Sequence, residues 1–282
     1  MITGLEGAGL GLRRDFIDQV DTLEPGAVDF WEVAPENWIP LGGRYERQLS
    51  ALTQRHPFVA HGLSLSIGSP SPLDVNFVKD VKGFLDRHNI LFYSEHLSYC
   101  SAKGHLYDLM PIPFTEAAVK HVVARIKQVQ DIIERPLVLE NVSYYAAPGQ
   151  EMTEQEFTCA VLEESGCLML LDVNNIYVNS INHGYDAEAF LKAMPSGKIV
   201  YGHIAGHYDE ADDLKVDTHG ADVIPAVWAL LEKAYALHGV FPTLLERDFN
   251  IPPLAELVTE VEQIRTLQRR FDMQHPDTGM RA

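Results

Sequence analysis

The sequence has few cysteines and no long apolar run, and both absences narrow the class of protein. Its three cysteines, Cys100, Cys159 and Cys167, are an odd number without CxxC spacing. We therefore expect free thiols in a reducing cytoplasm, and neither a disulfide framework nor a thiolate zinc site. No run approaches the ~20 apolar residues that cross a bilayer. Residues 1–12 lack the basic flank and the long apolar stretch of a secretory signal, so we predict a cytoplasmic protein without a membrane segment.

Basic residues are also scarce. Lys and Arg together number 22 against 40 Asp and Glu, which gives a formal net charge of −18. A protein of this charge repels polyphosphate chains at long range. Nucleic acid is therefore not an expected partner.

The chain contains no Ser/Gly linker, low-complexity segment or repeat, and its 282 residues are close to the ~250 of one (β/α)8 barrel. Eight short runs, several of them apolar at nearly every position, predict buried parallel strands. These runs cover residues 8–12, 29–33, 58–65, 90–97, 137–142, 168–173, 199–204 and 243–245.

Amphipathic stretches lie between the apolar runs and predict helices. They cover residues 75–88, 115–133, 153–164, 187–193, 223–238 and 254–270, with weaker patterns at 14–21 and 45–54. Asp74 and Thr115 occupy N-cap positions, and Thr153 with Glu156 fits a capping box. We predict an α/β fold, a TIM barrel that spans residues 1–282 as a single catalytic domain. The alternative, an open doubly wound sheet, lacks a Gly-rich phosphate loop after its first strand.

Nearly every predicted strand ends in a residue that binds metals or transfers protons. These residues are Glu32, His61, Glu95 with His96, Glu140, Asp172, His203 and Glu246. After the seventh strand, His207 follows in a loop, and Asp217 and His219 are placed on one side of an extended segment. In a barrel, the carboxyl ends of the strands converge on one mouth, where active sites are built. Five other histidines, His56, His88, His121, His238 and His275, fall on helix patterns or turns, and we expect them at the surface.

Such a mouth needs bound cations. Carboxylates gathered in one buried place repel one another and take up protons unless another charge offsets them. Divalent metal ions provide that charge, and neutral imidazoles complete their coordination. Oxygen and nitrogen donors without cysteine suit iron, manganese or zinc, and the donor types do not separate the three. Each residue taken singly is also compatible with a hydrogen-bonded place in the core.

The order of these residues resembles the order of ligands in the xylose-isomerase-like barrels, which include an endonuclease with three metals. The shared positions are His61, His96, Glu140, Asp172, Asn175, His203, Asp217, His219 and Glu246. The endonuclease has a histidine where this chain has Asn175, and this difference together with the acidity argues against DNA repair.

Longer motifs resemble one family more closely. They include GLGLR at 9–13, EVAPEN at 32–37, SEHLS at 94–98, LDVNNIYVN at 171–179, GHIAGH at 202–207, DTHG at 217–220 and LERD at 245–248. These segments are similar to the multinuclear non-haem iron-dependent oxidative enzymes, which include the catalytic subunit of methanobactin biosynthesis and the enzyme of the 3-thiaglutamate pathway. The resemblance implies iron- and dioxygen-dependent oxidation of cysteine in a ribosomally synthesised precursor peptide. It also implies a small partner protein that recruits the leader of that peptide.

The resemblance further implies roles for single residues. His61, His96 and Glu140 would hold one iron, and Glu140 would bridge to a second iron held by Asp172, His203 and Glu246. A third ion would lie at Asn175, Asp217 and His219. His207 is implied as an extra ligand or proton carrier, and Asp248 or His183 as a proton shuttle.

Two other readings of the same residues stay open. One is a metal-dependent sugar isomerase, phosphodiesterase or endonuclease-like hydrolase on the same barrel. The other is a metal-binding protein without turnover.

Overall fold

The computed structural model describes residues 4–102 and 104–274, without the side chains of His105, Tyr107 and Gln274. Eight parallel strands form a closed barrel in the order β1-β12-β9-β8-β7-β4-β3-β2, with helices between the strands. The barrel strands are β1 (Ala8–Gly11), β2 (Phe30–Val33), β3 (Phe58–Gly62), β4 (Tyr93–His96), β7 (Val138–Glu140), β8 (Leu168–Asp172), β9 (Ile199–Ile204) and β12 (Thr243–Leu245). All eight predicted strands are confirmed, and so is the predicted (β/α)8 fold.

The chain divides by its internal contacts into two units. The first contains Met1–Glu32, Leu171–Lys192 and Ile199–Ala282, and the second contains Val33–Leu170 and Ala193–Lys198. That a single domain occupies all of residues 1–282 stays a prediction, since residues 1–3 and 275–282 lie outside the described part of the chain.

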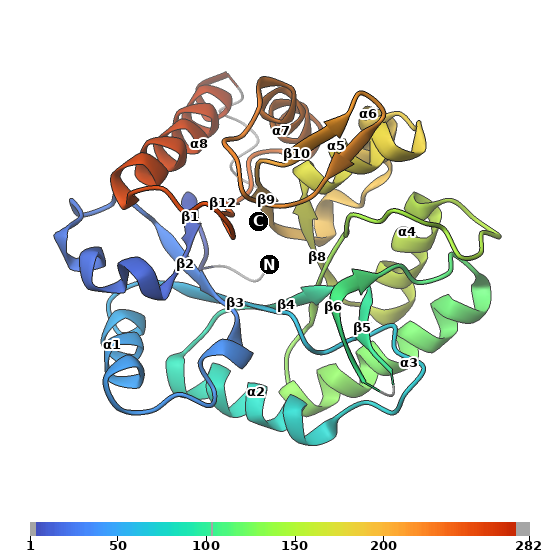
Figure 1. Cartoon of the computed structure of the whole chain (residues 1–282), viewed down its shortest axis with the longest axis horizontal. Coiled ribbons are helices and arrows are strands. Elements are labelled where there is room, and N and C mark those ends of the chain that lie inside the picture. The colour runs from blue at the N-terminus through green and yellow to red at the C-terminus, as the bar shows by residue number, and fades with distance from the viewer. Residues whose placement is uncertain (1–3, 103, 275–282) are drawn as a thin grey trace. The chain divides into compact units, whose positions relative to one another are not determined.

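In the second unit, helices cover the outer side of β3, β4 and β7 (Figure 1). They are α1 (Gly43–Thr53), α2 (Val75–His88), α3 (Glu116–Ile133) and α4 (Glu154–Ser165), and the short η2 (Pro35–Asn37) and η3 (Ser196–Lys198) belong to the same unit. The predicted caps are present: Asp74 accepts from two backbone amides of α2, Thr115 accepts from one of α3, and Thr153 forms the capping box with Glu156. These caps satisfy amides that the first turn of a helix leaves unpaired, and so fix where each helix begins.

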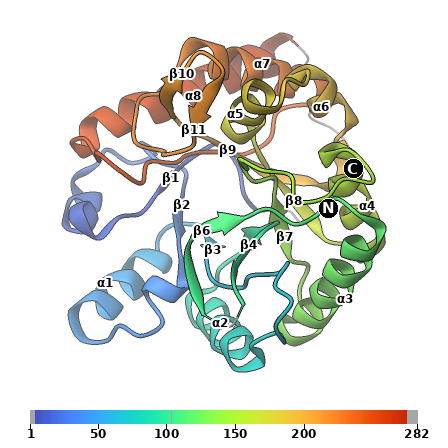
Figure 2. The same ribbon diagram turned by 45° about the vertical axis from the view of Figure 1, so that its right-hand side comes forward.

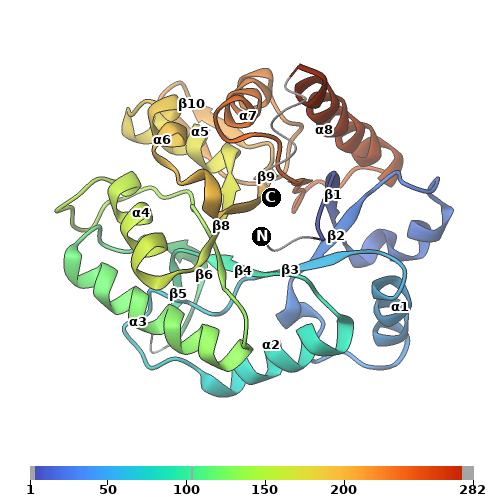
Figure 3. The ribbon, with the colours of Figure 1, turned by 180° about the vertical axis from the view of Figure 1, so that it is seen from behind.

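The first unit carries the remaining helices and a hairpin. These elements are η1 (Arg14–Thr22), α5 (Val173–His183), α6 (Ala187–Ala193), α7 (Pro225–His238), α8 (Leu254–Gln274), β10 (Tyr208–Ala211) and β11 (Leu214–Val216). The β10–β11 hairpin lies against α5 (Figure 2). α7 and α8 lie side by side, and α8 packs on β1 and β12 (Figure 3).

Besides the short η2 and η3, one helix and two hairpins were not predicted. α5 begins directly at the end of β8, because the Asp172 side chain accepts a hydrogen bond of 2.6 Å from the backbone amide of Asn175 and caps the helix. The other two are antiparallel hairpins inserted after barrel strands: β10–β11 after β9, and β5 (Tyr99–Ser101) with β6 (His105–Met110) after β4.

The expectation that the helix histidines lie at the surface is wrong for His88. Its ring is buried and lies 4.6 Å from the ring of Phe84. The expectation for His275 falls outside the described residues. Within the described residues, no helix combines the length and the apolar character that a membrane span requires.

Candidate metal centre

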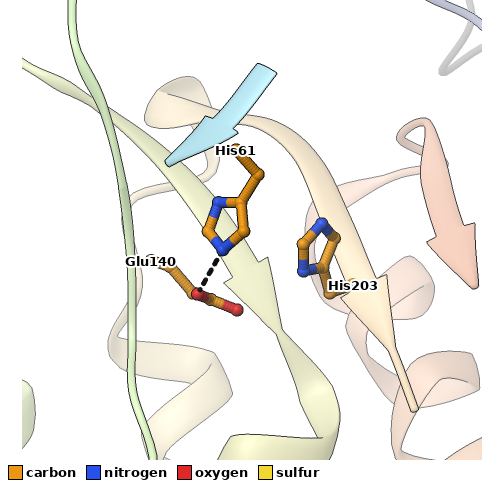
Figure 4. Close-up of side chains that lie close together, drawn as sticks. All are labelled: His61, Glu140 and His203. Carbon is orange, nitrogen blue, oxygen red and sulfur yellow. Dashed lines mark ion pairs between the residues drawn. The ribbon is translucent and has the colours of Figure 1, made fainter. Parts of the chain in front are cut away.

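Three predicted ligands of the second unit meet at the carboxyl ends of β3, β4 and β7. The Nε2 atom of His61 lies 3.2 Å from Nε2 of His96 and 3.2 Å from Oε2 of Glu140, and His96 Nε2 lies 3.3 Å from the same oxygen. Figure 4 shows the ion pair between His61 and Glu140. A point close to the plane of this triangle is ~2 Å from all three atoms, which is the distance between a transition-metal ion and its nitrogen or oxygen ligands.

The other nitrogen of each ring determines its tautomer. His96 Nδ1 lies 3.0 Å from the carbonyl oxygen of Gly62, which only accepts hydrogen bonds, so Nδ1 carries the proton. His61 Nδ1 lies 2.8 Å from the hydroxyl of Ser94, and that hydroxyl donates to the carbonyl of Ala60. The hydroxyl therefore accepts from His61 Nδ1. In the neutral rings both Nε2 atoms then present lone pairs to each other and to a carboxylate oxygen, an arrangement that is favourable only around a cation.

Glu95, on the same strand as His96, is placed differently. Its Oε1 accepts from the hydroxyl of Tyr93 at 2.7 Å and from the amide of Leu65 at 3.0 Å. Complete burial, and then the charge of Glu36, raise the pKa of Glu95 to about 8. Glu95 therefore stays protonated near neutral pH and is held by hydrogen bonds of its own, which sets it apart from the ligand triangle.

The first unit contains a second group of predicted ligands. Asp172, His203 and Glu246, at the ends of β8, β9 and β12, each offer a donor atom within 4.8 Å of the others, and all three are buried. His203 Nδ1 lies 3.0 Å from Glu246 Oε2. Burial raises the pKa of Glu246, but His219 and His203 lower it by more, so this carboxyl stays ionised well below its ordinary range.

Glu32 was noted at a strand end but was not predicted as a site residue. Its Oε2 lies 3.1 Å from His203 Nε2 and accepts a hydrogen bond of 2.9 Å from the hydroxyl of Tyr201. A carboxylate on one nitrogen of a histidine fixes the ring and makes the other nitrogen a better ligand. His203 therefore presents Nδ1 toward Glu246, whereas the rings of His61 and His96 present Nε2.

Asp217 and His219 are brought together, but not by an extended segment as predicted. His219 has a φ of 47°, in the left-handed region, and this turn carries its ring back so that Nε2 lies 2.7 Å from Asp217 Oδ1. His219 Nδ1 faces Asp248 Oδ2 at 3.1 Å and Glu246 Oε2 at 3.4 Å. Burial lowers the pKa of His219, but Asp217 and Glu246 raise it by more, to well above its ordinary value.

Two further predicted residues occupy the same unit. The guanidinium of Arg13 forms an ion pair with Asp248 and also donates a hydrogen bond of 3.1 Å to the carbonyl of Arg247. His207 is buried against the ring of Tyr177, 5.2 Å away between ring centroids. Burial lowers the pKa of His207, and the opposing effects of Asp209 and Asp217 are smaller.

Asn175 and His183 both lie on α5. Asn175 is buried in its first turn, beside Asp172. His183 is exposed at the last residue of the helix. Since a helix rises ~1.5 Å per residue, His183 lies at the opposite end of α5 from the other predicted residues.

The chain is similar to known proteins over nearly its whole length. A family model described as "RiPP precursor modification enzyme MbnB/TglH/ChrH" matches residues 7–269. UPF0276 proteins of Shewanella sediminis and Shewanella loihica are 66% and 67% identical over 260 and 262 residues, which are 92% and 93% of this chain and 94% of each relative.

Similar solved structures include two sugar epimerases. D-psicose 3-epimerase from Clostridium cellulolyticum aligns with a TM-score of 0.62 at 12% identity over 95% of this chain and 99% of its own. The 3-keto-D-glucoside 4-epimerase from E. coli aligns with a TM-score of 0.62 at 13% identity over 92% and 98%. At these identities the likeness is one of fold, the xylose-isomerase-like barrel. By the match to nearly its whole length, the chain belongs to the MbnB/TglH/ChrH family of RiPP precursor modification enzymes.

Proposed function

We propose that this protein oxidises cysteine residues of a ribosomally synthesised precursor peptide, with iron as its metal and dioxygen as co-substrate. The observation that carries the proposal is the triangle of His61 Nε2, His96 Nε2 and Glu140 Oε2. Two neutral imidazoles and one carboxylate form a donor set that suits ferrous iron. Membership of a family that modifies precursor peptides supports the substrate class.

In this proposal each unit holds metal with its own donors at strand ends. His61, His96 and Glu140 would hold one ion, and Asp172, His203 and Glu246 would hold a second. Asn175, Asp217 and His219 would hold a third. Support comes from the closed order of the parallel strands, since the residues named lie at or just after strand ends.

The residues of the chain have separate tasks in this proposal. Bound ferrous iron supplies affinity for a cysteine thiolate and electrons for dioxygen. Glu32, with the hydroxyl of Tyr201, holds the ring of His203 in place. His207 Nε2 and the carboxylate of Asp248 hold or transfer protons beside the third position. These groups act mainly by positioning, which contributes much of the rate when two reactants must meet in one geometry.

The proposal also names a compartment and a partner. Free thiols at Cys100, Cys159 and Cys167 fit a reducing cytoplasm, where ferrous iron also stays reduced. A small protein that binds the leader of the precursor is the proposed partner. Because the formal net charge of the protein is −18, a basic leader peptide or a basic partner surface would complement its charge.

The test starts with protein purified without air and loaded with ferrous iron. A Cys-containing precursor peptide encoded beside the gene for this protein is added with and without dioxygen. The mass of the product is then measured by mass spectrometry. We expect a mass change of the cysteine-containing fragment that requires dioxygen, and none with Glu140→Gln. A mass change without dioxygen would overturn the oxidative mechanism, and fewer than two equivalents of bound transition metal would overturn the centre. Turnover of a plain sugar with no action on the peptide would favour the isomerase instead.

A further inference from the structure

Asn174 has no assigned role, yet both ends of its side chain are engaged in the first unit. The residue is fully buried in the first turn of α5. Its Nδ2 donates to Asp217 Oδ1 at 2.9 Å, and its Oδ1 lies 2.8 Å from His207 Nδ1. A single amide therefore connects a predicted ligand of the third metal position to the buried histidine of the loop after β9.

The partners fix which way this amide points. Asp217 Oδ1 also lies 2.7 Å from His219 Nε2, and a carboxylate oxygen accepts hydrogen bonds from both groups. The Asn174 atom that faces it must be the NH2 group, and the oxygen then faces His207. His207 Nδ1 must therefore carry a proton and donate it.

The other nitrogen of His207 is left with a lone pair. In the neutral ring, protonation at Nδ1 makes Nε2 an acceptor. Nε2 is buried and makes no hydrogen bond with the described residues, and Asp209 Oδ1 lies 3.6 Å from it. Since the His207 side chain is only 1% exposed, its lone pair stays inside the protein.

We propose that Asn174 is a positioning residue that aims Asp217 at the third metal position and holds His207 as the Nδ1–H tautomer. The first half rests on the proposed function, because it needs a metal at that position. The second half rests on hydrogen bonds within the chain alone. Asn174 thus couples the placement of Asp217 to the tautomer of His207.

Two substitutions separate the halves. Asn174→Asp keeps an oxygen toward His207 but replaces the donor to Asp217 with an oxygen that repels it. Asn174→Ala removes both contacts. Asn182→Ala is the matched control, because Asn182 also lies on α5 and also uses both ends of its amide. Its two hydrogen bonds are to the backbone of Lys215 in the β10–β11 hairpin. The control reports what loosening the hairpin does without touching Asn174.

The first measurement is the tautomer of His207 in metal-free protein, by nitrogen-15 NMR of labelled histidine at pH 8, with His207→Gln to identify its signals. We expect Nδ1–H in the unsubstituted protein, in Asn174→Asp and in Asn182→Ala. Asn174→Ala should change to Nε2–H, because Asp209 then becomes the acceptor that remains. An Nε2–H ring in the unsubstituted protein, or an unchanged Nδ1–H ring in Asn174→Ala, would overturn this half.

The second measurement is the number and affinity of ferrous ions bound without air. Asn174→Asp and Asn174→Ala should weaken one ion at least about tenfold, the range for residues that orient ligands, and Asn182→Ala should not. Equal affinities in all four proteins would overturn the metal half. Failure of the dioxygen reaction on peptide would overturn the proposed function but leave both measurements standing, since neither uses substrate or dioxygen.

Discussion

The Nε2 atoms of His61 and His96 face each other across 3.2 Å, and both rings use Nδ1 for hydrogen bonds within the chain. This relationship restricts what can occupy the space between them. Either a metal ion or a proton between the two Nε2 atoms would relieve the repulsion of their lone pairs. A metal ion and a proton therefore compete for the same place, and binding of metal releases protons.

Glu140 Oε2 is the third corner of the triangle formed with these two nitrogens. The substitution Glu140→Gln therefore tests the triangle directly. The amide lacks the charge that balances a cation, and its NH2 group can face the two rings as a donor. We expect loss of at least one equivalent of iron, measured by metal analysis after anaerobic loading, while the circular dichroism stays that of the folded barrel. Glu116→Gln, at an exposed position of α3, is the control. Full metal content in Glu140→Gln would remove Glu140 from the centre.

Ser94 tests whether the tautomer of His61 matters. Ser94→Ala removes the hydroxyl that accepts from His61 Nδ1, and the loss of such an orienting contact costs roughly 10–100-fold in metal affinity. Titration of the metal-free protein with ferrous iron measures the change. Ser165→Ala is a matched control, since Ser165 is also a buried serine, whose hydroxyl donates to a carbonyl of its own helix α4. Equal affinity in Ser94→Ala and Ser165→Ala would show that His61 needs no such support.

The sequence was enough to place the barrel strands, because their apolar runs are a property of each strand alone. It was also enough for the helices with N-caps such as Asp74 and Thr153. Helix α5 was missed because residues such as Asn174, Asn175 and Val178 are weak helix formers, and its start is fixed by Asp172, which also ends a strand.

The sequence predicted which residues belong to the candidate site more completely than it predicted the contacts between them. Strand ends are visible in a sequence, so His61, Glu140 and His203 were found. Asn174 was not predicted, because its hydrogen-bond partners Asp217 and His207 lie 43 and 33 residues away in the chain. Glu32 was seen at a strand end, but its contact with His203 spans 171 residues and follows only from the closed barrel. The bend at His219 depends on a positive φ, which the local sequence pattern did not predict.

Phe249 tests how the peptide meets the centre. Its side chain is 64% exposed, while the backbone beside it is held by a hydrogen bond of 2.9 Å from the Asp248 amide to the His219 carbonyl. Aromatic side chains are enriched among the residues that anchor bound partners, and Phe249 follows Asp248 directly in the chain. Under the proposed function, Phe249→Ala should raise KM for the precursor peptide about tenfold, as expected for ~1.4 kcal/mol of lost contact.

In that experiment kcat and iron content should stay unchanged, because Phe249 offers no ligand atom. Tyr45→Ala is the control, an exposed aromatic on α1. An equal KM for Phe249→Ala and the unsubstituted enzyme would exclude this contact. A fall in iron content would instead assign Phe249 a structural role in the loop.

His88 predicts a pH dependence of stability that is separate from the metal centre. Burial, and then the charge of Arg87, lower the pKa of His88 below its ordinary value, and Glu46 opposes this only weakly. The unfolded chain has a His pKa of about 6.5, so between the two pKa values the unfolded state binds more protons than the folded state. The stability linked to His88 is therefore complete above pH 6.5 and is lost as the pH falls from 6.5 to the lowered pKa.

His88→Phe removes the titrating group and keeps an aromatic ring against Phe84, at the cost of the 3.3 Å contact with the Thr53 hydroxyl. Urea unfolding of metal-free protein at pH 7.5, 6.5, 5.5 and 5.0 measures the free energy of unfolding. We expect the variant to lose less stability than the unsubstituted protein below pH 6.5 and the two to keep a constant difference above it. Groups common to both proteins cancel in this comparison. His121→Gln, at an exposed position of α3, should follow the unsubstituted protein, and parallel curves for His88→Phe over the whole range would show that burial does not restrict protonation of His88.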